Sequence, residues 1–433
     1  MSELAPSIEL IAPPSVYEVG GQRFDAASQE FAGRFAEAIA DAHGTLSRPR
    51  CMCIRSPKRH GVEMYVARLA GLNSGFIVKR MPNTGSQHAP DCPSYEPPPE
   101  SSGLGQVLGS AITEDPATGE TTLKLDFSMS KITGRSVMQS AGGDSDSVTS
   151  CGTKLSLRGL LHYLWDQAEL TRWQPGFEGK RSWGTVRKHL LLAAENKIAR
   201  GHALRTQLYV PDVFSVEQRD ALNVRRIAQW SPAIAAPGKP QRLMLLIAEV
   251  KEILPARYGF KAVMKHVPDQ AFAMDEQIYR RLGRRFESEL ALWGAADDIR
   301  MVIIATFSIA AAGIPTIVEL SLMPVTRQWL PVENGFEKQL IDRLVADGRC
   351  FVKGLRYNLS RDNKLACATL TDCDGSAPFL FVVRAGNEGI GHELDERNLC
   401  EPSWLWNTSS EAMPSLPPQR LRPPRTAQPV ATS

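Results

Sequence analysis

The sequence lacks most of the short motifs that identify enzymes. It contains no phosphate-binding Gly-rich loop ending in Lys-Ser or Lys-Thr, no Gly-x-Ser-x-Gly nucleophile turn and no His-Glu-x-x-His pair. The usual signatures of nucleotide hydrolases, serine hydrolases and zinc proteases are therefore missing. These absences favour a binding protein over an enzyme.

Signals for secretion are also missing. Residues 1–14 have no basic region followed by an apolar run. The 8 cysteines are unevenly spaced, which is not the pattern of a secreted disulfide framework. We therefore expect a cytoplasmic protein with reduced thiols.

One stretch of 18 uncharged residues, 301–318, approaches the minimum length of a membrane-spanning helix. Its residues are largely β-branched, and Gly313-Ile314-Pro315 interrupts it. We interpret it as two buried strands joined by a turn, and we expect no membrane association.

The length of 433 residues suggests two or three domains of about 150 residues each. The alternation of helical and strand-like patterns predicts a multidomain α+β protein. The predicted segments are an N-terminal zinc-clamped β-hairpin module (1–133), a basic winged-helix-like segment (153–230), a mixed α/β C-terminal domain (241–400) and a Pro-rich tail (401–433). A Gly-, Ser- and Asp-rich stretch separates the first two.

Three thiols and an imidazole occur in two close pairs. Cys51 and Cys53 form a Cys-x-Cys pair, whose side chains point to the same side of an extended backbone. His88 and Cys92 form the second pair, and Cys3His is a common closed set for structural zinc. Between the pairs, strand-like runs at 64–68 and 76–80 predict a hairpin that brings them together. The sequence therefore predicts one structural Zn²⁺ bound by Cys51, Cys53, His88 and Cys92.

Other interpretations of the cysteines remain open. The thiols can be scattered reduced side chains accompanied by a surface histidine, and His60 is a rival for the fourth ligand position. A second metal site formed by Cys350, Cys367, Cys373 and Cys400 is also conceivable, although their spacing is irregular.

Residues 153–230 are mostly helical by periodicity and strongly basic. Apolar positions predict helices from about 157 and from about 183, the second capped by Ser182, and Ser215 begins a capping box for a third. The segment holds 13 Lys and Arg against 7 Asp and Glu, a net charge of +6, whereas the whole chain carries +3.

Four of these basic residues lie near the start of the second helix. They are Lys180, Arg181, Arg187 and Lys188. Helix-turn-helix proteins contact DNA at this position, and the helix dipole also favours phosphate there. We predict a nucleic-acid surface, with a solvated helix face as an equally weighted alternative.

The C-terminal part begins with an apolar strand at 243–250 and a long helix at 269–293. A helix at 335–346 followed by strands at 350–357, 365–370 and 378–383 outlines a restriction-endonuclease-like core. Its strands carry Ala366, Ala368, Phe381 and Val383 where acids and a lysine are needed, so we predict a degenerate core. An alternative is a metal-dependent nuclease that uses Asp212, Glu249 and Lys251 to bind a divalent ion and activate water.

Several sequence segments resemble those of one bacterial family. The segments are Cys51-x-Cys53, His88 with 91–95, and residues 155–165, 179–183 and 351–359. Together they resemble the family named domain of unknown function 1173. The resemblance implies an accessory protein of plasmids and integrative conjugative elements, without an assigned activity. Its partners would be DNA or proteins of conjugation or replication. A structural protein-interaction module that binds no nucleic acid is the remaining alternative.

Overall fold

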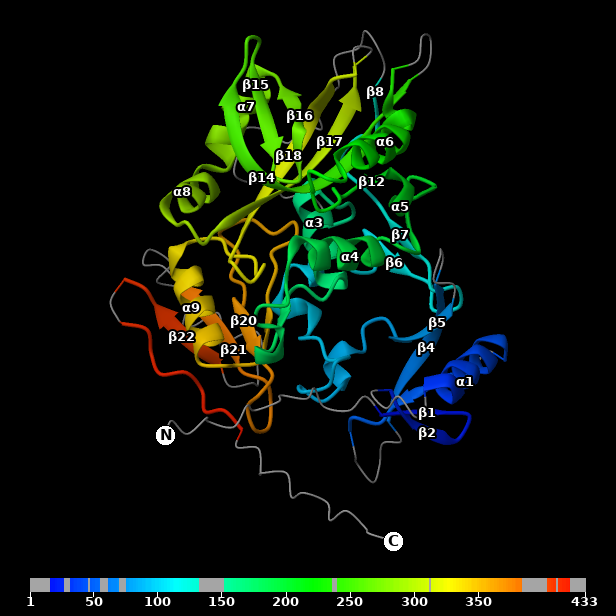
Figure 1. Cartoon of the computed structure of the whole chain (residues 1–433). Helices are drawn as coiled ribbons and strands as arrows, with labels where there is room; N and C mark the ends of the chain where they lie inside the picture. Colours follow the sequence, from blue (N-terminus) through cyan, green and yellow to red (C-terminus); the bar gives the residue numbers. More distant parts are fainter. Residues whose placement is uncertain are drawn as a thin grey trace, which may run out of the picture.

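The computed structural model describes residues 16–26, 32–45, 47–54, 61–69, 75–131, 152–235, 240–310, 313–383, 403–409 and 412–420. Helices and several β-sheets make up these residues, so the fold is α+β as predicted (Figure 1). Within the described part of the chain, no helix combines the length and apolar character needed to cross a bilayer.

The N-terminal sheet is antiparallel and follows the order β2-β1-β3-β4-β5. Its strands are β1 (Val16–Val19), β2 (Gln22–Asp25), β3 (Arg50–Cys51), β4 (Val62–Leu69) and β5 (Gly75–Arg80). The β4–β5 pairing confirms the predicted hairpin. Helix α1 (Ala32–Gly44) buries Ile39 and Ala42 against this sheet.

A small sheet joins residues on both sides of the predicted boundary at 134–152. Its order is β11-β10-β7-β6, and β10 pairs in parallel with β7. The strands are β6 (Ile112–Glu114), β7 (Thr121–Leu123), β10 (Lys197–Ala199) and β11 (His202–Ala203). Between β5 and β6 the chain forms η2 (Gly85–Gln87), η3 (Pro99–Ser101) and α2 (Leu104–Val107). Strand β8 (Ser130–Lys131) pairs with β13 (Gln241–Arg242).

Helices α3 (Leu157–Gln167) and α4 (Trp183–Ala193) form the centre of the largest hydrophobic cluster. Ser182 caps α4 as predicted, by accepting a hydrogen bond from the Thr185 amide. The predicted capping box at 215–218 is wrong, because the Ser215 hydroxyl bonds the Glu217 carboxylate and the helix begins later. The remaining elements are β9 (Arg172–Trp173), η4 (Pro175–Phe177), α5 (Leu204–Gln207), β12 (Leu208–Tyr209), α6 (Arg219–Trp230) and η5 (Ser231–Ala233).

Five strands between residues 244 and 325 form a closed ring of pairings at one end of the molecule (Figure 1). They are β14 (Met244–Pro255), β15 (Phe260–Met264), β16 (Val267–Met274), β17 (Arg300–Ile309) and β18 (Pro315–Val325). The last two confirm the strands predicted within 301–318.

The helix predicted at 269–293 is wrong in its first turns, which belong to β16. The Asp275 carboxylate accepts the Ile278 amide at 2.7 Å and so starts α7 (Glu276–Arg285) only there. Helix α8 (Glu287–Ala295) follows directly. Propensity alone did not reveal this boundary.

The C-terminal sheet has the order β22-β21-β20-β19-β9 and packs against α9 (Gly335–Ala346), whose bounds match the prediction. Its strands β19 (Phe351–Lys353), β20 (Ala368–Leu370) and β21 (Phe379–Val383) are shorter than expected. Strand β22 (Ser403–Asn407) pairs in parallel with β21. The Trp404 indole donates to the Ser415 carbonyl at 2.9 Å, so part of the predicted tail packs on the fold.

Candidate metal centre

The four predicted ligands come from the end of β3, the bend that follows it at Cys53, and the loop after β5. Cys51 ends β3, where it pairs with Tyr17 of β1 and Val62 of β4. His88 and Cys92 lie in the loop after β5, in tight turns closed by backbone bonds from His88 to Gly85 and from Cys92 to Ala89. The sheet and these turns hold the two ligand pairs facing each other.

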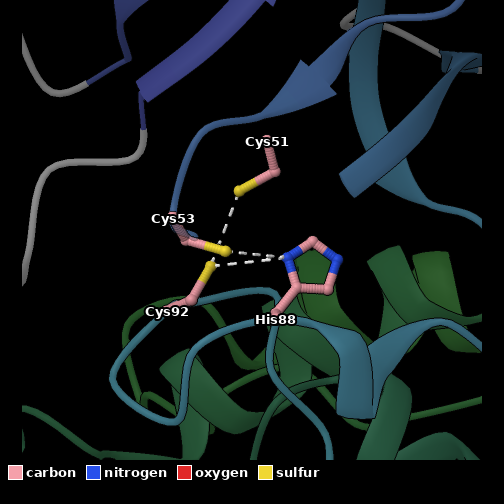
Figure 2. Close-up of side chains that lie close together, drawn as sticks. All are labelled: Cys51, Cys53, His88 and Cys92. Atoms are coloured by element: carbon pink, nitrogen blue, oxygen red, sulfur yellow. Dashed lines mark hydrogen bonds between the residues drawn. The ribbon is translucent and has the colours of Figure 1, made fainter. Parts of the chain in front are cut away.

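The three sulfurs and one ring nitrogen point toward a common centre (Figure 2). Sγ of Cys51 lies 3.7 Å from Sγ of Cys92, and Nδ1 of His88 lies 3.4 Å from Sγ of Cys53 and 3.7 Å from Sγ of Cys92. All four ligand atoms lie within 4.8 Å of one another. A tetrahedral ion with metal–sulfur bonds of about 2.3 Å separates two sulfurs by about 3.8 Å. The cluster therefore has the dimensions of a tetrahedral metal site and can hold a metal ion.

The surroundings of the cluster favour thiolate ligands. The amides of Ala89 and Ser94 donate to the sulfurs of Cys53 and Cys92, at 3.5 and 3.4 Å. Hydrogen bonds from Cys51 and Cys92 hold the pKa of Cys53 far below its usual range, whereas hydrogen bonds with Cys53 and Cys92 and burial raise the pKa of Cys51. A bound cation would replace the thiol protons, because metal ligation deprotonates thiols.

The site is closed. Cys51, His88 and Cys92 are buried, and Cys53 is half-buried. Three sulfurs and one nitrogen fill four positions, which leaves none for a water or a substrate. Nε2 of His88 is buried and has no hydrogen-bond partner among the described residues. The arrangement suits a structural metal rather than a catalytic one.

The structure bears on only part of the alternative metal-site interpretations. His60 and Cys400 lie outside the described residues. Across the described ranges, Cys350, Cys367 and Cys373 do not assemble into a second group of metal ligands.

Two glycines support the centre, and no sequence motif indicated their role. Gly61 has a φ of +76°, and a Cβ there would lie 2.8 Å from the carbonyl oxygen of Cys51. A Cβ on Gly85 would lie 2.6 Å from Cβ of Glu96. Each glycine therefore permits a close approach that positions a ligand-bearing segment.

Comparison with known proteins places the chain in one family. The family model for a protein of unknown function (DUF1173) matches residues 17–409. The chain belongs to the DUF1173 family. No curated protein and no solved structure matches it. All four ligands of the metal centre lie within the matched part of this DUF1173 protein.

Two of the segments that resemble DUF1173, residues 155–165 and 351–359, contact each other. The Asn358 side-chain oxygen accepts hydrogen bonds from the amide and the hydroxyl of Ser156, at 3.1 and 2.8 Å. The Tyr357 amide donates to Nδ1 of His162 at 3.0 Å, and burial lowers the pKa of His162 to about 3. His162 is therefore a neutral acceptor inside the DUF1173 core.

The four basic residues predicted to bind nucleic acid fall into two kinds. Lys180 and Lys188 are exposed. The Arg181 guanidinium donates to the carbonyls of Leu170 and Arg172 and lies over the Trp173 ring at 5.3 Å. Arg187 donates to the Val210 carbonyl at 3.0 Å and pairs with Asp212 at 2.9 Å. Both arginines make internal contacts, so the exposed charge of this cluster comes from the two lysines.

The three residues of the nuclease alternative are held in separate ion pairs. Asp212 contacts Arg187 and Arg225. Glu249 is buried and contacts Lys265 at 2.9 Å and Arg300 at 3.2 Å. Lys251 is exposed and lies 3.9 Å from Glu252. Among the described residues, no group of possible metal ligands includes Asp212 or Glu249.

Proposed function

We propose that this DUF1173 protein is a zinc-stabilised accessory protein of a mobile genetic element that binds nucleic acid. The spacing of Cys51, Cys53, His88 and Cys92 carries the zinc assignment, because sulfur and nitrogen ligands at these distances suit tetrahedral Zn²⁺. The closed coordination makes the ion part of the fold. Reduced thiol ligands agree with a cytoplasmic location.

The nucleic-acid part of the proposal rests on charge. Residues 153–230 carry a net charge of +6 in a chain of +3. Lys180, in the turn before α4, and Lys188 of α4 are exposed, so a phosphate backbone can reach them. Arg181 and Arg187 hold the loops beside α4 and act as supports of this surface.

The biological setting follows from the family resemblance. Accessory proteins of plasmids and integrative conjugative elements act beside conjugation and replication proteins, which are therefore the expected protein partners. A nuclease is less favoured, because Asp212 and Glu249 are each paired with cations. An interaction module that binds only protein is the competing outcome of the experiment below.

The experiment is a titration of labelled duplex and single-stranded DNA with the full-length protein at about 50 and about 200 mM salt. Binding should weaken as salt rises, because each neutralised phosphate releases condensed counterions. The double variant Lys180→Ala/Lys188→Ala should bind more weakly and show a slope shallower by roughly 0.9 per lost contact on duplex DNA.

The matched control is Arg23→Ala/Arg343→Ala, which removes two exposed charges from β2 and α9. It should bind like the wild type. If the wild type binds neither DNA at the lower salt, the protein-interaction alternative replaces the proposal.

A further inference from the structure

The five-strand ring has a specific order. Strand β14 pairs antiparallel with β15 and with β17, β15 pairs with β16, and β18 pairs with β17. The closing contact, Ala273 to Thr316, makes β16 parallel to β18. Helices α7 and α8 connect the third strand to the fourth. This connectivity is that of the oligonucleotide/oligosaccharide-binding (OB) fold, a partly open five-stranded Greek-key barrel.

The first strand of the barrel bends as closure requires. From Met244 to Val250, β14 pairs with β17, and from Val250 to Pro255 it pairs with β15. The β14–β15 pairing contains an irregularity between Val250 and Glu252, at the point where β14 leaves β17. A bulge bends a strand and increases its twist, so one strand can serve two sides of a barrel.

The inside of the barrel is packed. The rings of Trp230, Phe272 and Phe307 meet edge to face, with centroids 5.4 to 5.6 Å apart. Met244, Leu246 and other buried side chains belong to the same cluster. A ligand therefore has to bind on the outside of the barrel.

One outer side of the barrel is covered by the rest of the protein. Leu245 and Ile247 of β14, with Val302 and Ile304 of β17, belong to the cluster built around α3 and α4. The other outer side carries β15. Ala262 and Met264 are buried inside, so the alternation of a strand turns Lys261 and Val263 outward, where both are half-buried.

The β14–β15 loop presents an aromatic ring and a cation. Tyr258 is 83% exposed, the highest value among the exposed large hydrophobic side chains of the described residues. The Arg257 guanidinium lies 5.4 Å from the centre of its ring. Gly259 shapes the loop, because it has a φ of +79° and a Cβ there would lie 2.7 Å from the Met274 carbonyl oxygen.

The charge near this loop suits a polyanion. Residues 251–265 contain four basic side chains and one acidic side chain. Lys265 pairs with the buried Glu249, and Lys251, which is 60% exposed, pairs with the Glu252 carboxylate at 3.9 Å. Arg257 and Lys261 therefore add positive charge beside the exposed ring.

We infer that the barrel binds single-stranded nucleic acid across β15 and the β14–β15 loop, with a base stacked on Tyr258 and phosphates near Arg257 and Lys261. OB folds bind oligonucleotides on the face of the second and third strands and on this loop. An exposed aromatic ring beside cations suits unpaired bases, because stacking needs a free base face that a duplex does not offer. An oligosaccharide would gain little from the cations. The inference rests on the proposed nucleic-acid binding and adds a second binding surface, for single strands, to the surface at Lys180 and Lys188.

The test uses the full-length protein, fluorescent oligo-dT and oligo-rU longer than the roughly 4–16 nucleotides that one OB fold covers, and a duplex of equal length. Tyr258→Ala should weaken single-strand binding by roughly 5- to 150-fold and leave duplex binding unchanged. Tyr258→Phe should bind like the wild type, because it keeps the ring. Arg257→Ala/Lys261→Ala should make the salt slope shallower by roughly 0.7 per lost contact. The comparison of dT with rU shows which of the two single strands binds more tightly.

The outcomes separate this inference from the proposed function. If the protein binds single strands but Tyr258→Ala and the double variant bind equally well, the location is wrong and the proposed function stands. Preference for the duplex overturns the strand type. Absence of any nucleic-acid binding overturns both. Arg23→Ala/Arg343→Ala serves again as the charge-matched control, and unchanged thermal melting shows that the variants are folded.

Discussion

Asp91 and Arg420 form an ion pair across 329 positions of the chain, with a carboxylate oxygen 3.2 Å from a guanidinium nitrogen. Asp91 directly precedes the ligand Cys92. Arg420 also contacts the Asp374 carboxylate and the Cys373 carbonyl, each at 2.9 Å. The loop that carries the ligand Cys92 is therefore linked through Arg420 to the loop between β20 and β21.

Arg420→Ala should loosen residues 412–420 without releasing the metal. The ion pair is more than one-third exposed on both sides, so it contributes at most about 1 kcal/mol to stability. We expect unchanged zinc content, a small fall in melting temperature and faster hydrogen exchange in 412–420. Arg343→Ala, which removes an exposed helix pair, is the control. Unchanged exchange in the Arg420 variant would contradict this role.

The purified protein should carry one zinc per chain, and Cys51→Ser or Cys92→Ser should lose it. Metal-binding energy at a structural site is folding energy, so both variants should also melt earlier and respond to chelator less than the wild type. Elemental analysis and melting curves measure the two effects. Cys350→Ser changes a half-buried cysteine outside the cluster and should keep the ion. Full zinc content in both ligand variants would refute the assignment.

Local patterns predicted the ligands and several elements of the fold. Predicting the Cys51–Cys53 and His88–Cys92 pairs required only strand alternation and one turn. Residues 335–346 have an apolar face and follow a capping residue, Asn334. Such rules act within a few residues. They correctly predicted that Cys51, Cys53, His88 and Cys92 lie together, and they predicted the N-terminal hairpin and the helix α9.

Long-range pairing was beyond the same rules. Residues 267–274 form a strand because they pair with β15 and β18. No local sequence pattern predicts those pairing partners. Charge counts likewise did not show that Arg181 and Arg187 donate hydrogen bonds to backbone carbonyls. The sequence also did not reveal that Tyr258 stays exposed while neighbouring aromatics pack. Each of these facts depends on contacts between segments far apart in the chain.

Arg181 and Lys180 are adjacent, but their substitutions should differ. Arg181→Ala removes hydrogen bonds to the carbonyls of Leu170 and Arg172 and should destabilise the protein by about 1–3 kcal/mol. Lys180→Ala, at an exposed position, should leave stability unchanged within about 0.5 kcal/mol. Denaturant unfolding measures both. Equal stability of the two variants would show that Arg181 is not a structural support.

Lys197 should make the protein more stable as the pH rises above neutral. Its ammonium lies buried in β10, 3.0 Å from the Thr121 hydroxyl. Burial, with a smaller effect of Lys79, lowers the pKa of Lys197 from its ordinary value of 10.5 to about 7. Between these two pH values the unfolded chain binds a proton that the folded chain has released. The free energy of unfolding therefore increases with pH across this window.

Lys197→Met tests this sign directly, because methionine fills similar space without a charge. From pH 7 to pH 9 the wild type should gain about 2 kcal/mol from this residue, and the variant should lack that gain. The variant should also exceed the wild type in stability at pH 7, where the buried amine is costly. Lys188→Met, at an exposed position on α4, is the control and should keep the wild-type pH slope. Denaturant midpoints at the two pH values measure this difference. The same pH dependence in the wild type and in Lys197→Met would mean that the buried amine keeps an ordinary pKa.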